Sequence, residues 1–340
     1  MPLAEQDFIS RVTQAFDLSE EEIEGTLYYV NSLFNKESGP HAALQRYFNE
    51  SLDNVLFPLY RTLTAESWQN ISQARDILNH AGLLVVFNHP HGTEVFPGAL
   101  TTFFLLDPNQ NADRAFLTSH HLVQKPSSKR MHKPESWGKV VLTHAGFHVG
   151  RTRPISVYLE KFGQLDKERR RKNLEAKFQT AHLLSQPNSF VGLYPEGNIQ
   201  ISLGQAKEGL GQFIATGYGY TLPVTTNIIE WLRGGGNTKQ IPPLTIHRPI
   251  ENKCLMEYAH EVAPENPEQV ASDYVMCHIA SALPPHQRGD YESFMRDSLL
   301  EESCLQNEEF AELVRRVIRV QKLNYSMGRT SPPLSLTQGT

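Results

Sequence analysis

The sequence predicts an α/β fold with a central mixed sheet covered by helices, a helical N-terminal region and C-terminal helices. Two patterns along the 340-residue chain predict it. In the middle of the chain, short apolar runs bounded by turn residues alternate with segments of helical periodicity, as expected for strands and their covering helices. Both ends show helical periodicity without such runs.

Residues 1–80 are expected to form helices. Ser19 and Glu22 have the spacing of a capping box and precede an apolar stripe of helical period. A second periodic stretch covers residues 44–56 and ends before Pro58. No catalytic pattern is visible in this region.

Six apolar runs in the middle of the chain predict strands, at residues 83–87, 115–118, 139–142, 190–194, 222–226 and 244–247. Four segments have the spacing of helices, at residues 99–106, 156–165, 167–184 and 208–216. After residue 265 the pattern is helical again, and Asn307 is placed to cap a helix with acids in its first turn. We therefore divide the chain into a helical N-terminal region (1–80), an α/β domain (81–265), C-terminal helices packed on it (266–327) and a loose tail (328–340).

Charge is unevenly distributed along the chain. Overall, 32 Lys and Arg face 37 Asp and Glu, a net charge of −5 that argues against a general nucleic-acid-binding protein. Residues 120–180, however, hold 14 basic and 5 acidic residues, which gives this window a net charge of +9. The rest of the chain therefore has a net charge of −14. This window predicts an anionic partner, such as a phosphorylated substrate, an acidic carrier protein or an anionic membrane surface. The alternative is a solvated helix face.

Neither a membrane span nor a secretory leader is expected. No apolar stretch approaches the ~20 residues that cross a bilayer, and the first residues lack a basic start followed by an apolar core. Cys254, Cys277 and Cys304 are far apart and form no Cys-x-x-Cys pair, which indicates a reducing compartment. We therefore expect a cytoplasmic protein, with Cys277 in the core of a helical layer.

The first group of chemically suited residues follows the run at 83–87, where α/β sheets place their sites. It reads Asn-His-Pro-His-Gly-Thr-Glu, from Asn88 to Glu94. His89 can act as a general base if the carboxylate of Glu94 accepts a hydrogen bond from one ring nitrogen, because the other nitrogen can then take a hydroxyl proton. The alternative is a loop histidine without a catalytic role.

Two further groups follow other apolar runs. Glu196 and Gly197 lie on a turn after the run at 190–194, where a carboxylate can contact an acceptor hydroxyl. Arg151 and Arg153 alternate in an extended segment, so they project to the same side and can jointly bind a phosphate. Lys207 adds a cation further along the chain.

Four blocks in this order resemble those of the glycerol-phosphate and lysophospholipid acyltransferase superfamily. They occupy residues 88–94, 145–151, 194–198 and 221–226, so the resemblance covers roughly residues 80–250. It implies transfer of an acyl group from a thioester of coenzyme A or acyl carrier protein to a hydroxyl of a glycerol-type acceptor, without a metal or other cofactor. It further implies that His89 is the base, that Glu94 orients it, and that Arg151, Glu196 and Gly197 bind the acceptor.

The blocks also differ from the family pattern. Glu94 stands where the family usually has Asp, and Asn198 and Ile199 replace the usual Thr-Arg. His-Pro-His-Gly at 89–92 resembles the block of diacylglycerol and wax-ester type acyltransferases, whose acceptor carries no phosphate. A neutral acceptor is therefore the main alternative.

Two other classes of function stay open. A histidine-ligated metal hydrolase could use residues drawn from His89, His91, His120, His121, His144 and His148. An acyltransferase-like binding module without activity is the second. Dinucleotide and phosphate-loop sites are not expected, because Gly234, Gly235 and Gly236 lack the required spacing.

Overall fold

The computed structural model describes residues 10, 11, 14, 63–89, 99, 101–107, 111–119, 152–158, 166–197, 200, 202–227 and 244–292. Several expected elements lie outside these ranges: the helical stretches before residue 60, the strand at 139–142, the glycine triplet, the helix after Asn307 and the tail. Glu94 and Arg151 lie outside them as well.

A mixed sheet forms the centre of the fold, as the sequence predicts. Its strands are β1 (Leu83–Phe87), β2 (Asp113–Ser119), β3 (Arg153–Val157), β4 (Ser189–Leu193), β5 (Tyr220–Thr226), β6 (Leu244–Ile246) and β7 (Ile250–Glu251). The order is β3-β2-β4-β1-β5-β6, with β7 pairing with β5 off this path. Strands β1 to β5 are parallel, and β6 and β7 run antiparallel to β5.

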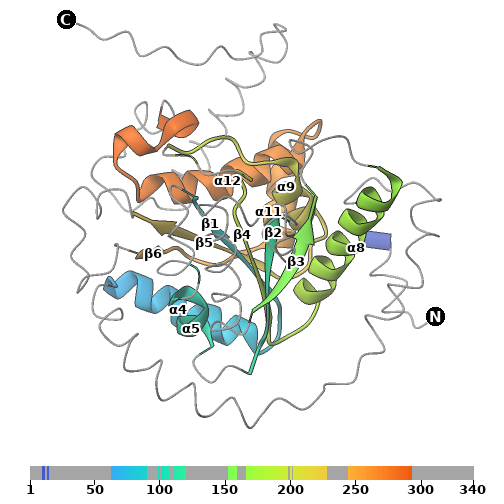
Figure 1. Cartoon of the computed structure of the whole chain (residues 1–340). Helices are drawn as coiled ribbons and strands as arrows, with labels where there is room; N and C mark the ends of the chain where they lie inside the picture. The colour runs from blue at the N-terminus through green and yellow to red at the C-terminus, as the bar shows by residue number, and fades with distance from the viewer. Residues whose placement is uncertain are drawn as a thin grey trace, which may run out of the picture.

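Helices cover both faces of the sheet (Figure 1). On one face lie α4 (Ala65–Leu78) and α5 (Thr101–Leu106). On the other lie α8 (Lys167–Leu184), α9 (Glu208–Ala215), α11 (Asn252–Val262) and α12 (Pro267–Ser281). Two 3-10 turns, η3 (Pro285–Gln287) and η4 (Gly289–Tyr291), follow α12. Each face buries its own apolar cluster, so β1, in the interior of the sheet, is buried along its whole length.

The start of α8 follows from its sequence. The Asp166 carboxylate accepts a hydrogen bond from the backbone N–H of Arg169 (2.8 Å), which satisfies one of the free donors of the first turn. Apolar residues then recur toward the sheet, with Leu174, Phe178 and Ala181 buried. The α8 bounds agree with the predicted helix at 167–184.

A glycine in β4 allows aromatic rings to pack on the α4–α5 face. A Cβ atom on Gly192 would lie 2.5 Å from the Phe116 ring and 2.6 Å from the Phe103 ring. Both rings also belong to the cluster around Phe87 and Phe190. The absence of a side chain at position 192 therefore lets these rings approach the strand.

Two predictions of local structure differ from the structure. Ser156 and Val157 belong to β3, although the sequence pattern predicts a helix at 156–165. Pairing with β2 decides the conformation here, because Ile155 is buried on the sheet and every residue of β3 has a parallel partner. Helix α11 was not expected, and α4 packs on the same sheet although it lies in the 1–80 region.

Candidate functional site

The candidate site lies at the carboxyl ends of the neighbouring strands β1 and β4. Their register pairs Val86 with Leu193, which brings the residues after both strands to the same edge. From this edge the chain leaves β1 for α5 on one face and leaves β4 for α9 on the other. Such a point, where successive connections diverge to opposite faces, is where open α/β sheets form their binding crevices.

Two buried polar side chains fix the backbone that follows β1. The Asn88 amide donates to the Thr226 carbonyl (3.0 Å) and accepts from the Thr226 N–H (2.7 Å), which ties this backbone to the end of β5. On the other side, Glu196 Oε2 accepts from the His89 N–H (3.0 Å). His89 is therefore held between the ends of the two strands that flank β1.

The Glu196 carboxylate connects two loops. Its second oxygen, Oε1, accepts from the Gly204 N–H (2.9 Å), and the side chain is only 1% exposed. A buried carboxylate needs such donors, and backbone N–H groups supply them here. The acceptor contact expected of Glu196 stays a prediction; the structure shows its carboxylate bonded to backbone N–H groups of His89 and Gly204.

The His89 imidazole lies against the Tyr194 ring. The ring centroids are 4.0 Å apart, and the planes differ by 12°. The His89 carbonyl accepts from the Gln200 N–H (2.9 Å), so the loop after β4 bonds to both sides of the His89 backbone. Sequence reasoning placed Tyr194 in the 194–198 block without assigning it a role and did not identify Gln200, because ring stacking and loop pairing leave no spacing signal.

Gly197 and Lys207 lie at the same turn. Gly197 has φ +65°, a left-handed conformation that glycine adopts at low cost. The Lys207 N–H donates to the Pro195 carbonyl (2.8 Å), and a Cβ on Gly197 would be 3.5 Å from Lys207 Cγ. Four of the predicted site residues, His89, Glu196, Gly197 and Lys207, are therefore brought together.

The segment of 3-10 turns after α12 supports the loop that follows Glu196. The Leu203 N–H donates to the Gln287 carbonyl (2.9 Å), and the Asp290 N–H donates back to the Leu203 carbonyl (3.0 Å). Because Gly204 bonds to Glu196, this support is transmitted to the backbone of His89. No sequence pattern indicated this contact.

Arg153 does not belong to this site. It aligns with Ala115, which aligns with Val191, five residues before Glu196. At ~3.3 Å per residue, Arg153 lies about 16 Å from the site along the strand direction. Its guanidinium forms an ion pair with Asp113 (2.8 Å), near the amino ends of the strands. The structure therefore does not bring Arg153, predicted to bind an acceptor phosphate, together with His89.

The surroundings of Arg153 include a second ionisable side chain, His182. Burial and the neighbouring Arg153 guanidinium lower the pKa of His182 in α8, while Asp113 opposes the shift. A neutral imidazole beside Arg153 adds no repulsion, so the arginine is accommodated where Asp113 neutralises it.

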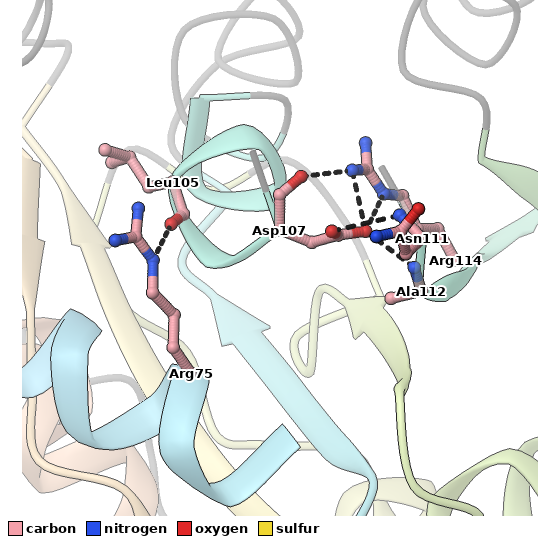
Figure 2. Close-up of polar contacts among 6 residues, drawn as sticks. All are labelled: Arg75, Leu105, Asp107, Asn111, Ala112 and Arg114. Atoms are coloured by element: carbon pink, nitrogen blue, oxygen red, sulfur yellow. Dashed lines mark hydrogen bonds and ion pairs between the residues drawn. The ribbon is translucent and has the colours of Figure 1, made fainter. Parts of the chain in front are cut away.

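A buried ion pair lies close by, at the amino end of β2 (Figure 2). The Arg114 guanidinium donates to Asp107 Oδ2 (2.9 Å) and to the Asp107 carbonyl, and its side chain is 1% exposed. Oδ1 and Oδ2 of Asp107 also accept from the N–H groups of Asn111 (3.0 Å) and Ala112 (2.7 Å). This network joins the end of α5 to β2, and Arg75 Nε caps the same helix end at the Leu105 carbonyl (2.7 Å).

A histidine pair lies between β6 and α12. Burial lowers the pKa of His247 to about 4, and burial together with the neighbouring His247 lowers that of His278 to about 3. The Thr225 hydroxyl lies 2.9 Å from His247 Nε2 and donates to the Ile279 carbonyl (3.0 Å). Both rings are thus held neutral at ordinary pH.

Within the described part of the chain, no group of three or more His, Cys, Asp or Glu side chains could hold a metal ion. The other histidines of the metal-hydrolase alternative, at 91, 120, 121, 144 and 148, lie outside that part. Among the described helices, none combines the length and apolar character needed to cross a membrane.

No protein-family model matches this chain, and no curated protein matches it. The resemblance to acyltransferases therefore depends on the four sequence blocks and on where their residues lie in the fold.

Proposed function

We propose that this protein is an O-acyltransferase. It moves a fatty acyl group from an acyl-thioester, acyl-CoA or acyl carrier protein, to a hydroxyl of glycerol 3-phosphate or a lysophospholipid. One observation carries the proposal: the Glu196 carboxylate, after β4, accepts a hydrogen bond from the His89 N–H, after β1. Two of the four resemblance blocks, distant in sequence, are thereby bonded to each other where α/β sheets bind ligands.

In the proposed reaction, His89 removes the proton of the acceptor hydroxyl as that oxygen attacks the thioester carbonyl carbon. The tetrahedral intermediate collapses with cleavage of the C–S bond, and the departing sulfur takes the proton, giving the ester and a free thiol. Glu94 is assigned the role of orienting the imidazole, and Arg151 that of contacting the acceptor. Glu196 and Tyr194 hold the base in place.

A specific observation favours the neutral-acceptor alternative as the second candidate. Arg153, one of two cations expected to bind an acceptor phosphate, is paired with Asp113 away from the site. The variant Arg151→Ala distinguishes a phosphorylated acceptor from a neutral one. A charge-assisted contact with a phosphorylated acceptor predicts a raised acceptor KM with little change in kcat. An unchanged KM identifies a neutral acceptor, such as diacylglycerol or an alcohol.

The decisive test is release of free thiol from acyl-CoA and acyl carrier protein donors, with phosphorylated and neutral acceptors. A positioned general base contributes roughly 100- to 10,000-fold, so His89→Ala should lose that much turnover. His80→Ala is the matched control. His80 lies in the turn that follows α4 and precedes β1, near the amino ends of the strands and away from the site at their carboxyl ends. Full activity of His89→Ala, or activity lost to chelators and restored by metal, would reject this mechanism.

We further propose a cytoplasmic location with peripheral attachment to an anionic membrane surface through the basic window. The start of α8 supplies Lys167, Arg170 and Arg171 as exposed cations. Flotation with anionic and neutral vesicles at low and high salt tests this attachment. Equal flotation with both vesicles would contradict it, and binding to an acidic carrier protein would assign the window to the donor instead.

A further inference from the structure

The Tyr194 ring stacks on the His89 imidazole, with centroids 4.0 Å apart and planes 12° from parallel. The nearby Phe103 and Phe190 rings meet differently, edge to face at 4.7 Å and 65°. Neutral aromatic rings prefer such tilted or offset pairs, because the electron-rich faces of parallel rings repel each other. A cation over the same face is attracted to it. The stack therefore places His89 over the electron-rich face of Tyr194, where positive charge that develops on the imidazole is attracted to the ring.

Both partners are held in place by the fold. The Tyr194 ring contacts Phe116 at 5.2 Å and Phe87 at 6.0 Å, each inclined by 55°, so the core fixes its plane. The His89 backbone is held through its N–H by Glu196 and through its carbonyl by Gln200. Little reorganisation is then needed to keep the two rings stacked.

The stack also suits a base that exchanges protons. The nitrogens of an imidazole form hydrogen bonds in the plane of the ring, whereas Tyr194 covers one face. Stacking on the ring face therefore does not compete with hydrogen bonds that the ring nitrogens form in the plane.

We propose that Tyr194 is a positioning residue that stabilises the charged form of His89. Its catalytic consequence depends on the proposed function, in which His89 becomes an imidazolium as it takes the acceptor's proton. Only interactions that are stronger in the transition state than in the ground state raise kcat. Tyr194 meets this condition, because its attraction for the imidazole grows as positive charge develops.

The test replaces Tyr194 by phenylalanine and then by phenylalanine analogues that carry an increasing number of fluorine atoms. This series lowers the electron density of the ring while its size stays nearly constant. Fluorine withdraws electron density from the ring face and weakens its attraction for a cation. We expect kcat for thiol release to fall stepwise, by about tenfold across the series, with the acceptor KM unchanged. Tyr194→Leu should resemble the most fluorinated ring. A flat kcat along the series would show that the ring only fills space and would overturn the proposal.

A second measurement requires no turnover. In proton NMR of the full chain, the His89 ring signals, identified by their loss in His89→Gln, should be shifted upfield by the Tyr194 ring and return to ordinary positions in Tyr194→Leu. A stack that favours the cation keeps this upfield shift when the solution is acidified. If the shift disappears on acidification, the charged ring leaves Tyr194 and the proposal fails. If no donor is turned over while the shift persists, the proposed function fails and the stacking inference stands.

Discussion

The two edges of the sheet use charged side chains in opposite ways. At the amino edge, charges neutralise each other: Arg114 with Asp107 in the interior, and Arg153 with Asp113 nearer the surface. At the carboxyl edge, the buried Glu196 carboxylate accepts backbone N–H groups from His89 and Gly204.

This difference shows how partners decide what a charged residue does. An ion pair satisfies two side chains and joins two elements. A carboxylate bonded to two loops instead fixes their backbones, and here it fixes the one that carries His89. Residue type alone would not separate Asp107 from Glu196, since both are buried acids in loops next to strands.

The largest expected effect is at the amino edge. Asp107→Asn keeps the shape of the side chain but removes the negative charge that pairs with the buried Arg114 guanidinium. Breaking a buried pair from one side costs about 3–5 kcal/mol, so the free energy of unfolding in urea should fall by that amount. Thiol-release activity of the folded fraction should change little. If the folded fraction also lost most of its thiol-release activity, the ion pair at the amino edge would be needed for function as well as for stability.

Glu196→Gln should have a smaller effect on stability and a larger one on activity. The amide supplies one acceptor, but its NH2 group then faces a backbone N–H of His89 or Gly204. An unsatisfied buried donor costs about 1–3 kcal/mol. Because the His89 backbone loses its support, kcat should also fall, and Glu208→Gln on the exposed start of α9 is the matched control. Unaltered kcat in a destabilised Glu196→Gln would assign Glu196 to folding alone.

The His247–His278 pair extends the comparison to ionisable groups held neutral. Their folded-state pKa values, about 4 and about 3, lie below the ordinary ~6.5 of the unfolded chain. The unfolded state therefore binds more protons as pH falls from 6.5, and stability present above that pH is lost progressively. We expect a loss of about 1–2 kcal/mol between pH 7 and 5, because water partly screens the half-buried rings. His247→Gln/His278→Gln should flatten this dependence in urea titrations, and an unchanged slope would place its origin elsewhere.

The smallest effect should come from Asp113→Asn, the partner of Arg153. This pair is partly exposed, at 35% and 55% of the side chains, so water screens it. Such pairs contribute about 0–1 kcal/mol. A loss as large as that of Asp107→Asn would show that burial does not distinguish the two pairs.

Much of the fold could be predicted because its elements carry local signals. The all-apolar run at 83–87 and the capped, periodic helix at 167–184 match β1 and α8. The prediction was wrong at Ser156 and Val157, where pairing with β2 overrides helical spacing. Helix α11 was missed because it begins directly after β7, with no loop residues to mark the boundary. The Asn252 side chain at its start is held by tertiary contacts, to the Thr221 hydroxyl and the Tyr218 carbonyl.

The site was only partly predictable. Position after an apolar run correctly grouped His89 with Glu196 and Gly197, because carboxyl ends of parallel strands meet at one edge. The same rule misplaced Arg153, which begins a strand instead of following one. The contacts of Asn88, Tyr194 and Gln287 depend on tertiary geometry that no spacing encodes.

The contact between the Leu203 loop and the turns after α12 has a consequence for the order of assembly. Gln205 donates to Asp290 across 85 residues of chain, and a Cβ on Gly289 would collide with the Leu203 carbonyl. The β1–β4 pairing closes an even longer segment, from Leu83 to Phe190, but it buries an all-apolar strand, whereas the Leu203 loop closes through a few hydrogen bonds. We therefore expect the strands to pair before the loop that supports the His89 backbone takes its final shape. During refolding, burial of the strands should be complete before the amide protons of residues 203–205 become protected from exchange.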